Sequence, residues 1–129
     1  MIRHNVAHRS AQNEVFNQLD AQDPSRPSIV TFKPAGSHTG SLWDAPDGLP
    51  EACWRPTVSD LYCYSLTQNC VDVCLTGLTC REEVNAAISG VQQGKLMTAE
   101  VEYLNLYGDL HRNKFKIQEV SPERLIYQT

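Results

Sequence analysis

The chain has 129 residues, a length that suits a single domain. Its 15 acidic and 11 basic residues give a formal net charge of −4 and a sequence pI near 5.5, and the basic residues are scattered. This pattern argues against nucleic acid or an anionic membrane as the main partner. No apolar run is long enough to span a bilayer, and residues 1–10 lack the apolar core of a signal peptide, so we expect a cytoplasmic protein.

The chain carries five cysteines, an odd number, without an export signal. We therefore expect reduced thiols rather than a disulfide framework. Their spacing contains no C-x-x-C pair, which argues against a zinc or iron–sulfur site. The cysteines are Cys53, Cys63, Cys70, Cys74 and Cys80.

The first half of the sequence predicts two strand–helix units. A short strand over 1–5 precedes a helix over 7–22, which Pro24 and Pro27 bring to an end. A second strand is expected over 28–33. The Gly- and Pro-rich stretch 34–55 follows as a long loop, and loops of this length often bind something.

The second unit ends with a helix over 57–68, which begins with Thr57 and Asp60 as a capping pair, and a third unit follows it. Residues 71–75 then predict a buried strand, after which Thr79 caps a helix and Glu82 reaches back to the cap amide. The apolar face of that helix comprises Val84, Ala87, Ile88 and Val91.

A further helix is expected over 98–112, with Tyr103, Leu106, Tyr107 and Leu110 on one side. A tail over 113–129 follows, in which Ser121 and Pro122 can start a last short helix. The alternation of strands and helices predicts an α/β fold with a parallel sheet. Three strands cannot close a barrel, so both outer edges would be open to association.

Three stretches resemble the aldo/keto reductase family. Residues 1–10 (MIRHNVAHRS), 28–43 (SIVTFKPAGSHTGSLW) and 71–91 (VDVCLTGLTCREEVNAAISGV) are similar to the last three βα units of its barrel, in the same order. The resemblance implies a partial (β/α)8 TIM barrel over 1–112, with three parallel βα units, a C-terminal helix and a tail over 113–129. It further implies an NAD(P)H-dependent oxidoreductase whose catalytic Tyr, Lys, Asp and His belong to the other half of the barrel.

Candidate ligand-binding residues cluster where the predicted strands end, because parallel α/β folds place their sites there. The glycines and serines of 36–41 can bring backbone amides and hydroxyls to an oxyanion, although a plain flexible loop fits the same composition. Arg81 can bind a phosphate at a helix N-terminus or be an ordinary exposed side chain. The candidates are Asn5, Gly36, Ser37, Gly40, Ser41, Gly77, Thr79 and Arg81.

The resemblance assigns roles to some of these residues. It implies that the 36–41 loop crosses the pyrophosphate of NADP or NAD and that Asn5 binds the nicotinamide carboxamide. From its residue type alone, Asn5 is equally well a turn former that bonds its own backbone. Glu83 and Ala87 occupy the positions of a family Arg and Asn that bind the adenosine end, so the resemblance does not separate NADP from NAD.

Two functional hypotheses follow. The chain is the C-terminal portion of an NAD(P)H-dependent aldo/keto reductase, or it is a non-catalytic barrel fragment that acts by oligomerising or by binding a partner. Its open edges would be covered by copies of itself, as a homo-oligomer, or by the missing barrel half. A small flavodoxin-like domain is a third interpretation, although such folds usually have five or more parallel strands.

Overall fold

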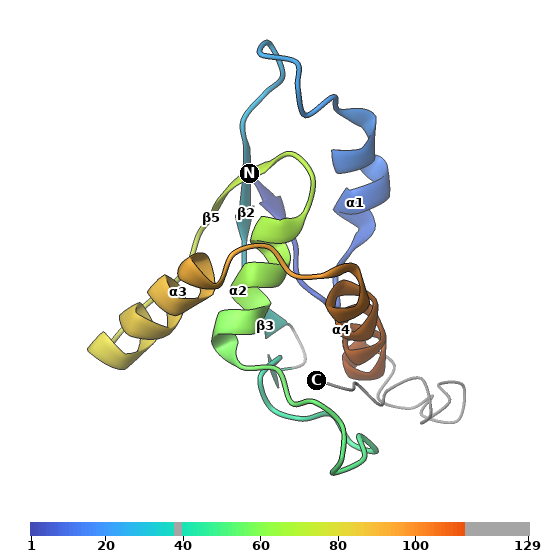
Figure 1. Cartoon of the computed structure of the whole chain (residues 1–129), viewed down its shortest axis with the longest axis vertical. Helices are drawn as coiled ribbons and strands as arrows, with labels where there is room; N and C mark the ends of the chain where they lie inside the picture. The colour runs from blue at the N-terminus through green and yellow to red at the C-terminus, as the bar shows by residue number, and fades with distance from the viewer. Residues whose placement is uncertain (38–39, 113–129) are drawn as a thin grey trace.

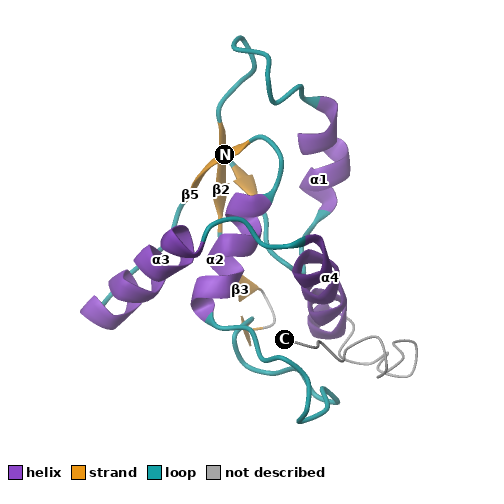
Figure 2. Cartoon of the chain, viewed as in Figure 1, coloured by secondary structure: helices purple, strands orange, loops and turns teal. Residues whose placement is uncertain are grey.

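The computed structural model, which describes residues 1–37 and 40–112, is an α/β fold with a three-stranded parallel sheet (Figure 1). The strands run side by side in the order β1 (Ile2–Arg3), β2 (Ile29–Phe32) and β5 (Val71–Cys74). Figure 2 shows the helices that lie beside them. These are α1 (Ser10–Glu14), the single 3-10 turn η1 (Phe16–Gln18), α2 (Val58–Thr67), α3 (Arg81–Gln93) and α4 (Thr98–Arg112). The expected α/β class and parallel sheet are confirmed.

Helix α1, the turn η1 and helix α2 cover one face of the sheet. Ile29 joins Ala11 of α1 and Phe16 of η1 in a buried apolar cluster. Thr31, two residues further along β2 and therefore on the same face, places its hydroxyl 2.9 Å from the Ser65 hydroxyl of α2. This face of the sheet is thus part of the core.

The opposite face of the sheet is more open. Val30 of β2 lies beside Val73 of β5 in the strand register, and Val73 is 44% exposed. The prediction of a buried strand over 71–75 was wrong in this respect. Since β5 is at the edge of the described sheet and α2 packs against it, its other side is left accessible.

A polar network at the centre of the molecule joins four elements. The His4 ring, fully buried after β1, stacks on Tyr64 of α2, and its Nδ1 lies 3.2 Å from the Ser65 hydroxyl. Its Nε2 lies 3.1 Å from the Gln12 amide nitrogen of α1. The Tyr64 hydroxyl donates to the Asn105 side-chain oxygen of α4 at 2.6 Å. The network fixes the helices relative to β1.

The larger apolar core lies between α2, α4 and the long segment that precedes α2. The predicted boundaries of α4 are confirmed, and Tyr103, Tyr107 and Leu110 are buried as expected. The Tyr103 hydroxyl donates to the Trp54 carbonyl at 2.5 Å, and the Tyr107 hydroxyl donates to the Leu42 carbonyl at 2.6 Å. Helix α4 thereby anchors both ends of the segment 42–54.

The predicted helix over 7–22 is shorter in the structure. Asn5 and His8 exchange two backbone hydrogen bonds, so the chain turns there and α1 starts only at Ser10. The helix ends when Val15 adopts φ −130°, outside the helical region. A single 3-10 turn follows, and the Asp20 carboxylate then accepts from the Gln22 amide, which favours a turn over continued helix.

The long stretch 34–55 contains a small hairpin, β3 (Gly36–Ser37) paired antiparallel with β4 (Gly40–Ser41). Leu42, Leu49 and Cys53 then enter the core. Helix α2 starts with the predicted capping box, in which the Asp60 amide and the Thr57 amide bond each other's side chains. Within the described residues, no helix is both long and apolar enough to cross a membrane. The predicted tail over 113–129 and its short helix lie outside those residues.

Candidate functional site

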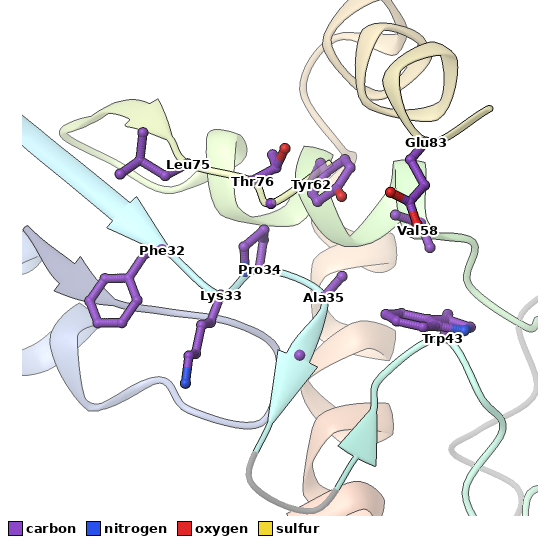
Figure 3. A pocket seen from close by; sticks show the side chains of 12 residues that line it. Phe32, Lys33, Pro34, Ala35, Trp43, Val58, Tyr62, Leu75, Thr76 and Glu83 are labelled. Carbon is purple, nitrogen blue, oxygen red and sulfur yellow. The ribbon is translucent and has the colours of Figure 1, made fainter. Parts of the chain in front are cut away.

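A cavity of about 550 Å³ lies at the carboxyl ends of β2 and β5. Figure 3 shows that its walls come from the end of β2, the hairpin that follows, α2 and the loop after β5. The lining is mainly apolar and includes the rings of Trp43 and Tyr62. Its polar groups are Lys33, Thr76 and Glu83, and two of the predicted glycines, Gly36 and Gly77, belong to it.

The backbone at the end of β2 is strained where it forms the wall. Lys33 has φ of 57°, the left-handed region that residues other than glycine rarely adopt, and Pro34 follows directly. The Asn5 amide group stabilises this bend, because it donates to the carbonyls of Lys33 and Gly36, both at 2.9 Å. Such strain persists where the surroundings hold it in place, which is common at functional sites.

Asn5 itself lies behind the wall and is fully buried. Its side-chain oxygen accepts from the amides of Ala7 and His8 at 3.0 and 2.9 Å, while its amide group makes the two bonds to Lys33 and Gly36. The interpretation of Asn5 as a turn former is therefore confirmed. All its hydrogen-bonding groups are engaged, so a contact with a nicotinamide carboxamide would have to replace one of these bonds.

The start of α3 differs from the prediction. Cys80, not Thr79, is the N-cap residue, and its side chain makes no capping bond. The carboxylate that reaches back is Glu83 rather than Glu82: it accepts from the Thr79 amide at 2.6 Å and from the Thr79 hydroxyl at 2.9 Å. The reason is register, because Glu83 is the third helical residue when the helix begins at Arg81.

This carboxylate changes the electrostatics of the cavity. Hydrogen bonds from the Thr79 amide and hydroxyl lower the pKa of Glu83, so it is negatively charged at neutral pH. It lines the cavity near the N-terminus of α3, where the sequence predicts an anion site. Figure 3 places Glu83 and Lys33 at opposite ends of the cavity, so an anionic ligand group is favoured at the Lys33 end.

The remaining predicted residues are not among those that line this cavity. Ser37 lies on β3, while Gly40 and Ser41 lie on the paired strand β4, with Gly40 at φ 120°. Arg81 is exposed in the first turn of α3 and is not part of the lining, and neither is Thr79. Gly36 and Gly77 thus line the same cavity, and Asn5 holds the backbone of the cavity wall through its hydrogen bonds.

Three aromatic residues of the site, Phe32, Trp43 and Tyr62, were not among the predicted ones. Trp43, half exposed, lies after the hairpin, and Tyr62 projects from α2. A Trp directly after a Gly/Ser-rich stretch was a usable signal for Trp43. Burial raises the pKa of Tyr62, although a hydrogen bond with Thr76 opposes this, so its hydroxyl stays protonated at neutral pH.

Among the described residues, no group of three or more His, Cys, Asp or Glu side chains is placed to hold a metal ion. All five cysteines are free, and His4 belongs to the buried polar network. The chemistry of the cavity is therefore that of the aromatic, glycine and charged residues that line it.

Comparisons of the chain with protein-family models, curated protein sequences and solved structures give no match.

Proposed function

We propose that this chain is the C-terminal, cofactor-binding portion of an NAD(P)H-dependent aldo/keto reductase with a (β/α)8 barrel. The observation that carries the proposal is the cavity at the carboxyl ends of β2 and β5, where parallel α/β folds bind their ligands. Its volume, about 550 Å³, is typical of small-molecule sites. The resemblance of its sequence segments to that family names the cofactor class.

The charges of the cavity define the orientation of the dinucleotide. The pyrophosphate lies at the Lys33 end, where the ammonium group and the backbone amides near Gly36 can contact its oxygens. A planar ring of the cofactor packs against Trp43. Glu83 repels a phosphate at the other end, so NADH binds better than NADPH.

The reduction of a carbonyl also needs a proton donor, and this chain is not its source. Tyr62, which lines the cavity, has a raised pKa, and among the described residues no lysine charge lowers it. In the resembled family, the catalytic Tyr, Lys, Asp and His lie in the other half of the barrel. This chain therefore binds cofactor without turning over a carbonyl substrate by itself.

Isothermal titration calorimetry with NADH and NADPH tests the proposal. We expect binding of NADH, with Lys33→Ala weakening it by roughly 5- to 10-fold because a charge-assisted contact is lost. Lys95→Ala is the matched control, since Lys95 is exposed and does not line the cavity. Glu83→Gln should improve NADPH binding relative to NADH. The absence of NADH binding, or equal effects of the two lysine variants, would refute the proposal.

A second candidate function is supported by a separate observation. Three aliphatic side chains of α3, those of Val84, Ile88 and Val91, are exposed to solvent. Exposed apolar side chains grouped on one helix commonly mark an association surface. We infer as the alternative a non-catalytic barrel fragment that acts by association. A chain that self-associates but binds neither nicotinamide cofactor would support this alternative over the first.

A further inference from the structure

Arg3, the last residue of β1, carries a charge that the described residues leave unpaired. Its Nε and Nη2 atoms are buried, and neither forms a hydrogen bond within the described chain. A guanidinium group stays protonated in proteins, so burial does not neutralise it. Buried charged groups are normally hydrogen-bonded to a group of opposite charge. Arg3 is therefore an exception that a bound group would resolve.

Two other arginines of the described chain, which are also partly buried, show what Arg3 lacks. Arg9 lies 2.6 Å from an Asp109 oxygen, and Arg26 lies 2.7 Å from an Asp72 oxygen. The sequence has 15 acidic and 11 basic residues, so carboxylates are not scarce. The described residues nevertheless place none of them at the buried nitrogens of Arg3.

The two unpaired nitrogens form one edge of the guanidinium group. The N–H bonds of Nε and Nη2 run parallel, and such an edge binds two oxygens of a single carboxylate or phosphate group. Arg3 as a whole is only partly buried, so rotation about its side-chain torsions can turn this edge outward. The unfilled partner of Arg3 is thus an oxyanion.

Arg3 lies on the face of the sheet opposite α1 and α2. Ile2 packs in the cluster around α1, and His4 stacks on Tyr64 of α2. Because side chains alternate along a strand, Arg3 between them points to the other face. In the strand register its partner is Phe32, which lines the cavity. Arg3 therefore borders the cavity on its β1 side.

Lys33 supplies a second positive charge at this end of the cavity. It directly follows Phe32, and Figure 3 shows both side chains on the same side of β2. No carboxylate of the described residues forms an ion pair with Lys33. A single carboxylate would balance only one of the two charges, whereas a phosphoryl group carries up to two negative charges. The two cations together favour a phosphoryl group over a carboxylate of a covering polypeptide.

We propose that Arg3 and Lys33 form a phosphoryl-binding subsite on the β1 side of the cavity. The guanidinium edge binds two oxygens of the group, and the ammonium contacts a third. For the identity of the whole ligand this subsite rests on the proposed function, in which the group is one half of the NADH pyrophosphate. The subsite itself needs only a phosphoryl group, so inorganic pyrophosphate is a suitable probe.

An NMR titration of the chain with inorganic pyrophosphate tests the subsite. We expect a saturable shift of the Arg3 Nε–H resonance together with shifts of the Lys33 and Gly36 amides. Acetate at the same concentrations should have much weaker effects, because it balances only one charge. Equal responses to acetate and pyrophosphate would overturn the assignment to a phosphoryl group. An Nε–H resonance that does not respond to pyrophosphate would overturn the subsite and would leave Arg3 to a carboxylate of another polypeptide.

Variants of Arg3 give a second measurement. Arg3→Met removes the guanidinium edge and should weaken pyrophosphate binding by about 10-fold, while Arg3→Lys, which keeps the charge without the fork, should have an intermediate effect. Arg112→Met is the matched control, since Arg112 is exposed at the end of α4 and does not line the cavity. Far-UV circular dichroism checks that each variant keeps its helices. Equal weakening by Arg3→Met and Arg112→Met would overturn the subsite.

NADH distinguishes the subsite from the cofactor-binding role. Equal NADH affinities of the wild-type chain and of Arg3→Met would overturn the subsite and leave the cofactor-binding role intact. Pyrophosphate binding that depends on Arg3, in a chain that does not bind NADH, would support the subsite and refute the cofactor-binding role.

Discussion

The side chain of Asn5 connects two stretches of the chain that are distant in the sequence. It bonds the amides of Ala7 and His8 and the carbonyls of Lys33 and Gly36, and Asn5 itself is fully buried. We expect Asn5→Ala to lower the free energy of unfolding by roughly 2–4 kcal/mol, because buried backbone groups lose their partners. Urea unfolding of the variant and of the wild-type chain measures this difference.

Asn17→Ala is the control for Asn5→Ala. Asn17 is exposed, and its amide group donates to the exposed side chain of Asn13. We expect its replacement to change the free energy of unfolding by less than about 0.5 kcal/mol. Similar effects of the two substitutions would show that Asn5 does not hold the strained end of β2.

His4 makes the stability of the chain depend on pH. Burial, with a smaller effect of the nearby Arg9 charge, lowers the pKa of His4 to about 4 from its ordinary 6.5. Between these values the unfolded chain binds a proton that the folded chain does not, so the free energy of unfolding falls as the pH falls from about 6.5 to 4. The loss attributable to His4 is about 3 kcal/mol over this range.

Urea unfolding at several pH values measures this loss, and His4→Gln removes the ionisable group. We expect the variant to be less stable at pH 7 but to show a smaller decrease between pH 6.5 and 4. An NMR titration of the His4 ring with a midpoint near 6.5 in the folded chain would contradict the assignment of a lowered pKa.

The packing of α4 against the turn after β1 depends on Gly108. A Cβ atom at this position would lie 1.8 Å from the Val6 carbonyl oxygen, a backbone atom that cannot move aside alone. We expect Gly108→Ala to destabilise the chain by roughly 3 kcal/mol or more, since α4 must shift away from its core contacts. Gly77→Ala should leave the melting temperature nearly unchanged, because a Cβ atom added there meets no other described residue than its chain neighbours within 4 Å.

The N-terminus of α3 can be strengthened by one substitution. Cys80 occupies the N-cap position in extended geometry but makes no side-chain capping bond. We expect Cys80→Ser to stabilise α3 by about 0.5–1 kcal/mol, because serine is a preferred N-cap residue of similar size. Slower hydrogen exchange of the first α3 amides checks this, and unchanged exchange would show that Glu83 already satisfies this end of the helix.

A helix or strand could be predicted from the sequence where the interactions that form it lie within the same segment. The α2 capping box and the spacing of apolar residues in α4 are local, so both helices match their predicted ranges. Helix α1 starts late because Asn5 and His8 close a turn before it, and the side chain of Asn5 is fixed there by its bonds to the distant carbonyls of Lys33 and Gly36. The exposure of β5 and α3 depends on which elements lie beside them, which periodicity cannot reveal.

At the scale of the whole molecule, one part of the candidate site could be predicted from the sequence and another part could not. The rule that ligands bind at the carboxyl ends of parallel strands located the cavity and two of its residues, Gly36 and Gly77. Trp43 and Tyr62 come from other segments and reach the cavity only through tertiary packing. Glu83 rather than Glu82 accepts from the Thr79 amide because α3 starts one residue later than predicted. A capping pattern in the sequence does not fix a helix start to within one residue.

The exposed aliphatic side chains of α3 and the cavity lie on different parts of the fold. The cavity lies at the carboxyl ends of β2 and β5, and Ile88 and Val91 are not among the residues that line it. We expect Ile88→Asp with Val91→Asp to change NADH affinity by less than about 2-fold, since these residues do not line the cavity. A larger loss, measured by calorimetry, would mean that α3 shapes the cavity.

Nitrogen-15 NMR spectra of the 14.5 kDa chain during titration with NADH test the cofactor-binding role most directly. We expect saturable shifts of the amides of Lys33, Gly36 and Gly77 and of the Trp43 indole, with little change in the exposed residues of α1. Spectra that stay unchanged at millimolar NADH, or shifts spread evenly over the surface, would contradict a nicotinamide-cofactor site at the carboxyl ends of β2 and β5.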